Sequence, residues 1–484
     1  MLMTQLHAIR PRRGLAFLRP WIARLLTVLL IPTLTGCGNG GSDSGEPQLI
    51  IELEGVSYLW KVRKVVLDSA NGGLHALGDI NGDGYSDILV AASRQGRGAS
   101  VDRGWIEAWS SRDGTLLWQQ SGKGVKEAKA DGNEDPYQFE DVTLVGDLNG
   151  DGIRDIYCRE AWSSRTAILL SGRDGSRIGR YPIERTDYLR RPVRWQDVDG
   201  DGSVDLVFRR YDKLRPLALQ ALSGVDFSLI PDFDHIRPDA RDPSAAWLLP
   251  QFRDVNADGI SDCVVRRGLR SSSTDPKYSY EYAVLSGKDF SAIRRFQTSR
   301  PRVGGDTVHA QARDLNGDTV EDILMASVTG AGQNNQTSFL RAISGSDGDV
   351  VWNVLGTQLP GGRKSLLVDA QTGRKTELGP DVEFGAPVIA TPDLNGDNVP
   401  EVVTVAGTPD GKRTRQAVLI FSGSDGNHLA ILDVPEERGA LKIGRTQIIL
   451  LDSVTAEGRS GVAVAGRTPL GNTMLAIFVL PDLR

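Results

Sequence analysis

Six acidic nonapeptides recur along the 484-residue chain, and each carries oxygen-bearing side chains at positions 1, 3, 5 and 9. The first copy is DINGDGYSD, which begins at Asp79. Such oxygens repel one another unless a hard cation lies among them, and calcium takes about six to eight oxygen ligands in loops of this kind. The spacing therefore predicts six calcium-binding loops, with the backbone carbonyl of position 7 as a further ligand.

Each loop offers four predicted side-chain ligands. In chain order they are Asp79, Asn81, Asp83 and Asp87; Asp147, Asn149, Asp151 and Asp155; Asp197, Asp199, Asp201 and Asp205; Asp254, Asn256, Asp258 and Asp262; Asp314, Asn316, Asp318 and Asp322; and Asp393, Asn395, Asp397 and Glu401. In the last two loops Thr319 and Asn398 replace the glycine of position 6, and Glu401 replaces the final Asp. We expect these two sites to be weaker, the fifth more so, because Asn accepts a positive φ more easily than Thr.

The segments around the loops exclude an EF-hand, which needs a Glu at position 12 and a helix on each side. Position 12 is never acidic here, and a short apolar run of β type follows each loop, such as Ile88 to Ala92. A second motif with the consensus SGxDG follows each loop once and separates two further β-type runs, as expected of a turn. One repeat is therefore strand a, acidic loop, strand b, connection, strand c, SGxDG turn and strand d.

Four-stranded repeats whose loops start 50 to 79 residues apart predict an all-β fold, a single β-propeller whose sheets pack face to face. The loops and turns resemble the FG-GAP or VCBS repeats, the calcium-loop propeller repeats of integrin α subunits and many bacterial surface proteins. The resemblance extends over nearly the whole chain after its N-terminal segment. It implies a calcium-binding propeller.

A seventh repeat that lacks the ligand spacing is expected at the C-terminus, where strands a, b and c are present but no strand d precedes Arg484. The segment YLWKV, from Tyr58 to Val62, is similar to the d strands LLWQQ and VVWNV and would complete this blade. Closure by strands from both ends of the chain would leave no open sheet edge in a seven-bladed ring. The alternative is six blades with two unrelated tails.

The first 36 residues are expected to be a bacterial lipoprotein signal peptide. Five arginines precede the apolar run Leu25 to Leu34, which is too short to span a bilayer comfortably. The sequence LTGC resembles a lipobox, which implies that Cys37 is lipidated after cleavage. Residues 37–47 would then be a flexible tether and 48–484 the propeller, held outside the cytoplasm on a bacterial membrane, either the outer membrane or the periplasmic side. The other cysteines, Cys158 and Cys263, are expected to be buried and unpaired.

Strand order places all the acidic loops and SGxDG turns on one face of the propeller, and the b–c and d–a connections on the other. Arginine and lysine gather in these connections, and cleavage before Cys37 would remove five arginines and move the net charge from −6 to −11. We expect the basic face to bind an anionic polysaccharide or an acidic protein partner, because Arg contacts carboxylate and phosphate in bidentate fashion. The alternative is a set of solvated loops with local ion pairs. The candidate ligand-binding residues are Arg209, Arg210, Arg266, Arg267 and Arg270.

Catalysis has little support in the sequence, which holds no GxSxG or HExxH motif and no spaced cluster among its five histidines. We name no catalytic residue and favour a monomeric binding protein with no nucleic-acid partner. Two alternatives stay open: a polysaccharide lyase-like enzyme that uses the basic face, and an envelope assembly lipoprotein that binds other proteins. The rhythm SGxDGxxxW is also similar to quinoprotein dehydrogenase repeats, but only Trp118 and Trp352 keep the tryptophan.

Overall fold

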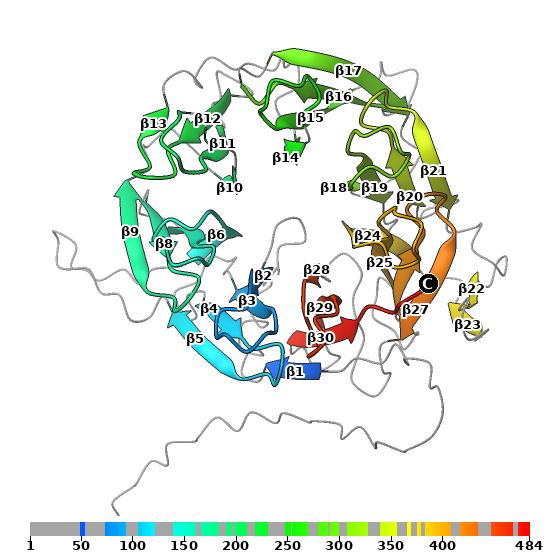
Figure 1. Cartoon of the computed structure of the whole chain (residues 1–484), viewed down its shortest axis with the longest axis horizontal. Coiled ribbons are helices and arrows are strands. Elements are labelled where there is room, and N and C mark those ends of the chain that lie inside the picture. The colour runs from blue at the N-terminus through cyan, green and yellow to red at the C-terminus, as the bar shows by residue number, and fades with distance from the viewer. Residues whose placement is uncertain are drawn as a thin grey trace, which may run out of the picture.

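The computed structural model shows a ring of β-sheets, each of which runs outward from an inner strand (Figure 1). It describes residues 49–53, 73–92, 105–121, 139–160, 166–182, 190–194, 197, 199–210, 218–230, 247–252, 254–269, 279–288, 291–299, 307–327, 339–355, 365–368, 375–378, 383–407, 417–433, 447–467 and 473–484. These residues form seven four-stranded antiparallel sheets and one separate two-stranded sheet. The predicted all-β, seven-bladed propeller is confirmed.

Blades 1 to 6 follow the predicted strand order a, b, c, d from the inside outward. Blade 1 contains β2 (Leu74–Gly78), β3 (Asp87–Ala92), β4 (Trp105–Trp109) and β5 (Leu116–Ser121). Blade 2 contains β6 (Phe139–Leu144), β7 (Ile156–Glu160), β8 (Thr166–Leu170) and β9 (Arg177–Pro182). Blade 3 contains β10 (Arg190–Arg194), β11 (Leu206–Arg210), β12 (Ala218–Leu222) and β13 (Leu229–Ile230). In these blades a strand, and not the helix of an EF-hand, follows each acidic loop, as the sequence predicted.

The later blades repeat this plan. Blade 4 contains β14 (Trp247–Phe252), β15 (Asp262–Leu269), β16 (Ser279–Leu285) and β17 (Ala292–Ser299). Blade 5 contains β18 (Thr307–Gln311), β19 (Ile323–Ser327), β20 (Phe339–Ile343) and β21 (Val350–Leu355). Blade 6 contains β24 (Glu383–Ala390), β25 (Val402–Gly407), β26 (Ala417–Phe421) and β27 (His428–Asp433). The hairpin of β22 (Ser365–Val368) and β23 (Lys375–Leu378) lies outside the ring beside β27 (Figure 1).

Apolar side chains on both faces of each central strand explain why the blades pack into a ring. In β3, Ile88 and Val90 belong to a cluster shared with blade 7, whereas Leu89 and Ala91 belong to a cluster shared with blade 2. Successive side chains of a strand point to opposite faces, so a continuous apolar run fits a strand that is covered on both sides. The core of the protein therefore consists of apolar layers between neighbouring blades.

Blade 7 is closed by a different strand from the one predicted. It contains β28 (Gln447–Leu451), β29 (Gly461–Arg467), β30 (Thr473–Val479) and, as its outermost strand, β1 (Leu49–Leu53), which pairs with β30. The prediction of Tyr58 to Val62 was wrong for this position, and that segment lies outside the described residues. Similarity to the tryptophan-bearing d strands was misleading, because pairing with strand c needs only an extended run of β-type residues, which LIIEL supplies.

The loop of blade 7 has lost the ligand spacing and instead joins blade 7 to blade 1. The Ser86 amide donates to the Ser453 carbonyl at 2.7 Å, and the Ser453 hydroxyl donates to the Gly84 carbonyl at 2.8 Å. Both partners in blade 1 belong to the first acidic loop. The two ends of the chain are therefore held together by strand pairing at the rim and by hydrogen bonds at the loop face.

Cys158 and Cys263 are both buried and are not joined in a disulfide, as expected. Residues 1–48, with the predicted signal peptide, Cys37 and the tether, lie outside the described residues. Among the residues that are described, no helix has the length and apolar character needed to cross a membrane.

Candidate calcium-binding loops

The aspartate at position 1 shapes each loop by accepting several backbone hydrogen bonds. In the first loop one carboxylate oxygen of Asp79 accepts from the Gly82 amide at 2.7 Å and the other from the Gly84 amide at 2.8 Å. Equivalent bonds to the amide of position 6 occur in all six loops. The amides converge on one carboxylate because position 6 has a positive φ, which is 87° at Gly84.

Positions 3 and 5 each accept a hydrogen bond from the amide two residues further on. In the first loop Asn81 Oδ1 accepts from the Asp83 amide, and Asp83 Oδ1 accepts from the Tyr85 amide, both at 2.9 Å. Such local turns are the favoured conformation of Asp and Asn. Each loop is therefore folded by its own side chains.

The carboxylate at position 9 is fully buried in all six loops. In blade 4 its two oxygens join the two motifs: Asp262 Oδ2 accepts from the Val255 amide of the loop at 2.7 Å, and Oδ1 accepts from the Gly287 amide of the SGxDG turn at 3.0 Å. Blades 2 and 5 show both bonds as well. The final ligand position of the nonapeptide therefore also fastens the a–b loop to the c–d turn.

Burial raises the pKa of these position-9 carboxyl groups, because water no longer stabilises the charged form. The pKa rises to about 7 at Asp87, Asp322 and Glu401, and to about 6 at Asp155, with repulsion from other loop carboxylates adding to the effect. Two buried oxygens, Asp87 Oδ1 and Glu401 Oε1, have no hydrogen-bond partner among the described residues. A divalent cation would stabilise the ionised form and give these oxygens a ligand.

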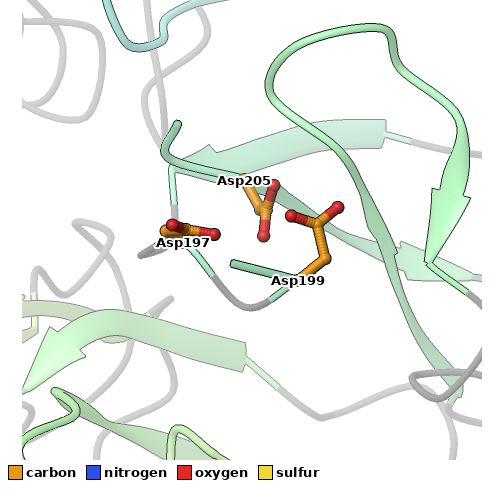
Figure 2. Close-up of side chains that lie close together, drawn as sticks. All are labelled: Asp197, Asp199 and Asp205. Atoms are coloured by element: carbon orange, nitrogen blue, oxygen red, sulfur yellow. The ribbon is translucent and has the colours of Figure 1, made fainter. Parts of the chain in front are cut away.

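Two of the loops bring their carboxylates closest together. Asp197, Asp199 and Asp205 of blade 3 each place an oxygen within 4.8 Å of the others. Figure 2 shows these three side chains lying close together. In blade 6 the same holds for Asp393, Asp397 and Glu401, although this loop departs from the sequence pattern. These oxygen-only donor sets fit a hard cation such as calcium.

The substituted loops keep the backbone of the others. Thr319 has φ 70° and Asn398 has φ 65°, close to the values of the glycines that they replace. Their amides still bond to the aspartate of position 1, at 2.7 Å in blade 5 and 3.0 Å in blade 6. The left-handed conformation is unfavourable for a β-branched residue, so Thr319 carries strain that Asn398 does not.

In blades 1 to 5 the serine that opens the SGxDG turn contacts the loop, a contact that the sequence did not predict. In blade 3 the Ser223 hydroxyl donates to Asp201 Oδ2 at 2.8 Å, and the corresponding serines of blades 1, 2, 4 and 5 lie 3.4 to 3.5 Å from the aspartate of position 5. In blade 6 Ser424 makes this contact at 3.1 Å. In the sequence, one such turn follows every acidic loop, and this regular pairing could have indicated that turn and loop are in contact.

The glycine at position 2 of the SGxDG turn is required because another backbone approaches it closely, and not because of a positive φ. A Cβ at Gly172 would lie 2.0 Å from the Arg154 carbonyl oxygen, and one at Gly224 would lie 2.0 Å from the Val204 carbonyl oxygen. Blade 1 has Ser111 at this position, and its buried hydroxyl has no partner among the described residues. The same blade contains the unpartnered Asp87 oxygen, so loop and turn are less well joined there.

The outer-strand tryptophans connect one blade to the turn of the next. Trp352 of β21 donates its indole N–H to the Gly423 carbonyl of blade 6 at 2.6 Å, and Trp118 of β5 donates to Gly172 of blade 2 at 3.2 Å. A Cβ at Gly426 or Gly175 would lie 2.8 or 2.6 Å from the respective indole ring. The SGxDGxxxW rhythm is therefore explained by packing between blades.

The candidate arginines lie mostly in strands rather than in the connections. Arg266 and Arg267 are residues of β15, opposite Tyr282 and Glu281 of β16. Arg209 and Arg210 end β11, and Arg270 follows β15 outside the described residues. On the loop face, Arg173 is not an isolated charge, because its guanidinium donates to the Asp151 carbonyl at 2.6 Å and lies 3.4 Å from Asp151 Oδ2.

Two family models match parts of this chain. One, described as an FG-GAP-like repeat, matches residues 147–208, from the second acidic loop to β11, and the other, an FG-GAP repeat, matches residues 76–103. The chain carries FG-GAP repeats. The longer stretch contains the second and third acidic loops and the shorter one contains the first, so the matched repeats hold three of the six candidate calcium centres. None of the curated proteins matches the sequence.

Several solved structures are similar to the chain at low identity. A crystal structure of BBS1N in complex with ARL6DN has 9% identity and a TM-score of 0.45, covering 87% of this chain and 95% of that one. A chain of the mitotic checkpoint complex has 10% identity and a TM-score of 0.41, covering 99% and 100%. The quinohemoprotein alcohol dehydrogenase from Comamonas testosteroni has 11% identity and a TM-score of 0.36, covering 89% and 78%. The description of the FG-GAP repeats as propeller blades rests on their own strand order.

Proposed function

We propose that this FG-GAP propeller is a calcium-stabilised, lipid-anchored binding protein that recognises an anionic glycan or an acidic partner outside the cytoplasm. The observation that carries the calcium assignment is the position-9 carboxylate, which is buried in six loops beside further carboxylates of the same loop. Burying an ionised carboxylate without an opposite charge nearby is unfavourable, even where backbone amides donate to it. Calcium supplies that charge and completes the donor set.

Calcium binding is tested by comparing thermal unfolding with and without a chelator, together with elemental analysis of untreated protein. Each site that is occupied at a calcium concentration about 100-fold above its Kd adds about 2.7 kcal/mol of stability, so chelation should lower the melting temperature clearly. Asp205→Asn should remove the contribution of the third site. Asp482→Asn is the matched control, because Asp482 is exposed and lies outside the loops. An unchanged melt in chelator, with no metal in the untreated protein, would refute the assignment.

The membrane anchor is supported by the order of features before the propeller. Five arginines and a short apolar run precede the sequence LTGC, which ends at Cys37, and a polar, glycine-rich segment separates Cys37 from β1. Stable attachment needs more than one acyl chain, as a lipidated N-terminal cysteine would provide. Mass spectrometry of the mature N-terminus and membrane fractionation of Cys37→Ser test this anchor.

The recognition surface is proposed at the ends of the b strands that point away from the calcium loops. In blade 4, β15 begins at Asp262, a predicted calcium ligand, and reaches Arg266 and Arg267 four and five residues later. A strand rises about 3.3 Å per residue, so these positions lie about 13 to 17 Å from the loop. In blade 3 Arg209 and Arg210 have the same relation to Asp205. Cationic positions therefore recur at the end of the blade opposite the carboxylates.

Replacing Arg266, Arg267 and Arg270 together by Ser should weaken binding to acidic glycans and reduce its dependence on salt, because fewer charge pairs remain to be screened. The matched control removes three charges from the loop face by replacing Arg112, Arg177 and Lys288. Arg173 is unsuitable, since it contacts Asp151. Equal losses in both variants would contradict the proposed recognition surface.

The same glycan panel separates the proposal from its alternatives. Retention of a glycan without turnover supports binding, and release of an unsaturated product would instead indicate a lyase. If no glycan is retained but an acidic protein is captured, and this capture depends on the same three arginines, the partner is a protein.

A further inference from the structure

The path of the first described strand fixes where an N-terminal anchor would leave the propeller. β1 is antiparallel to β30, with Leu49 opposite Ile477 and Leu53 opposite Thr473. Beyond β30, the Leu480 amide donates to the Ser460 carbonyl in the a–b loop of blade 7, and the Leu483 amide donates to the Leu394 carbonyl in the acidic loop of blade 6. β30 therefore ends at the face that carries the acidic loops, and the chain enters β1 from that same face.

The other blades give the same direction independently. Every d strand of blades 1 to 6 begins directly after an SGxDG turn, on the loop face, and β1 occupies the d position of blade 7. We infer that the calcium-loop face is turned toward the membrane and the arginine-bearing ends of the b strands away from it. This inference rests on the lipid anchor in the proposed function.

The length of chain before β1 favours this orientation. Eleven residues separate Cys37 from Leu49. A glycine-rich chain of that length has a root-mean-square extension of about 20 Å and a limit of about 40 Å. Turning the opposite face to the membrane would require the chain to pass the height of blade 7 first, which is about 17 Å for the five residues of β1. That path would use most of the root-mean-square extension of these eleven residues, and the tether would lose conformational freedom.

The same face carries exposed apolar side chains. Four large ones are exposed by 39% to 59% among the described residues: Leu116, Val225, Leu229 and Val350. Val225 is in the SGxDG turn of blade 3, and the other three are the first residues of d strands. Each of them lies at the end of the blades where the anchor would emerge. Apolar side chains that project from one face suit contact with the headgroup region of a bilayer.

The negative charge on this face means that bound calcium is needed for the face to lie against an anionic membrane. The loops hold three or four acidic ligands each, and without a cation they would repel anionic headgroups. Calcium in the loops offsets this repulsion. The calcium centres and the anchor would then act on the same side, leaving the arginines free to meet a partner beyond the membrane surface.

The test compares two substitutions in blade 7: Ala456→Cys in its a–b loop, and Thr468→Cys at the next position in sequence after β29, a strand that ends on the side opposite that loop. The lipidated full-length protein is purified, labelled with a donor fluorophore and inserted into phosphatidylcholine–phosphatidylglycerol vesicles that carry an acceptor on lipid headgroups. Cys158 and Cys263 are buried, so the introduced cysteine takes the label. We expect energy transfer to be several-fold stronger from position 456 than from position 468.

Transfer that is equal from both positions, or stronger from position 468, would overturn the orientation while leaving the anchor intact. Mass spectrometry of the same sample shows whether Cys37 is acylated, which tests the anchor separately from the orientation. If Cys37 carries no acyl chain, the anchor proposal is wrong and the orientation is rejected with it.

Discussion

The carboxylate that ends each acidic loop should make calcium binding depend on pH. In the calcium-free fold the pKa of Asp87, Asp322 and Glu401 is about 7, above the ordinary value of 3.8 for Asp or 4.5 for Glu. Between about pH 4 and 7 the folded state thus holds protons that the unfolded chain has lost, so the free energy of unfolding of the calcium-free protein falls as pH rises. Calcium needs the ionised form, so its affinity should rise over the same range.

Calorimetry in two buffers of different ionisation enthalpy measures this effect directly. At pH 6.5 calcium binding should release protons, and at pH 8.5 the release should be close to zero. Binding that releases no proton at pH 6.5 would show that the buried carboxyl groups are already ionised without the metal.

Ser111 offers a separate test of how the turn motif supports the loop. Ser111→Gly removes a buried hydroxyl with no described partner and allows the turn to approach Asp87, so it should stabilise the protein by about 1 kcal/mol. The reverse change in blade 2, Gly172→Ser, places a Cβ 2.0 Å from the Arg154 carbonyl oxygen and should destabilise by about 1 to 3 kcal/mol. Chemical denaturation measures both. Equal and small effects would mean that the close approach is not required.

The contact between an outer strand and the next turn is tested at Trp352. Trp352→Ala should lower the free energy of unfolding by about 3 to 5 kcal/mol, because the indole is buried between blades 5 and 6. Trp352→Phe keeps an aromatic ring but loses the hydrogen bond to Gly423, so about 1 kcal/mol is expected.

Glycine substitutions separate backbone strain from collision with that indole. Gly426→Ala adds a Cβ 2.8 Å from the Trp352 ring at φ 73°, whereas Gly458→Ala has φ 76° and no atom within 4 Å. Gly426→Ala should therefore be the more damaging, and the difference should shrink in the Trp352→Ala background. A difference that persists without the indole would contradict this account of the outer-strand contact.

Closure of the whole ring depends on a strand of five residues. A chain that begins at Gln48 keeps β1, whereas one that begins at Glu54 leaves β30 as an open edge. We expect the shorter chain to melt at a lower temperature and to self-associate, because an unpaired strand edge is a template for other chains. Scanning calorimetry and light scattering compare the two. Identical behaviour would indicate that hydrogen bonds such as Ser453 to Gly84 close the ring without β1.

Calcium should also affect how closely the propeller, held by the proposed lipid anchor, lies against an anionic membrane. With the donor at position 456, chelation should reduce energy transfer in vesicles that contain phosphatidylglycerol, because the emptied carboxylates are repelled over about 8 Å at physiological salt. Vesicles of phosphatidylcholine alone are the control and should show little change. A similar reduction in both kinds of vesicle would point to loss of structure instead.

Local chemistry in the sequence determined the repeat and its fold class. Ligand positions 1, 3, 5 and 9 organise each loop through bonds within nine residues, as at Asp79 and Asp83, and these bonds need no distant partner. Apolar runs such as that of β3 indicate strands covered on both faces. Because each blade repeats the same unit, the order of strands and the common face of loops and turns could be predicted from one sequence.

Only the tertiary structure decided which distant groups meet. Two β-type runs could have closed blade 7, and pairing with β30 selected Leu49–Leu53. The glycines and serines of the turns were predicted as turn residues, but contact with a loop some 20 residues away in the chain explains them, as at Ser223 and Asp201. Arg266 and Arg267 lie in β15 and not in a connection, because pairing with β16 continues as far as Leu269. Such contacts depend on the packing of whole blades, which no short stretch of sequence encodes.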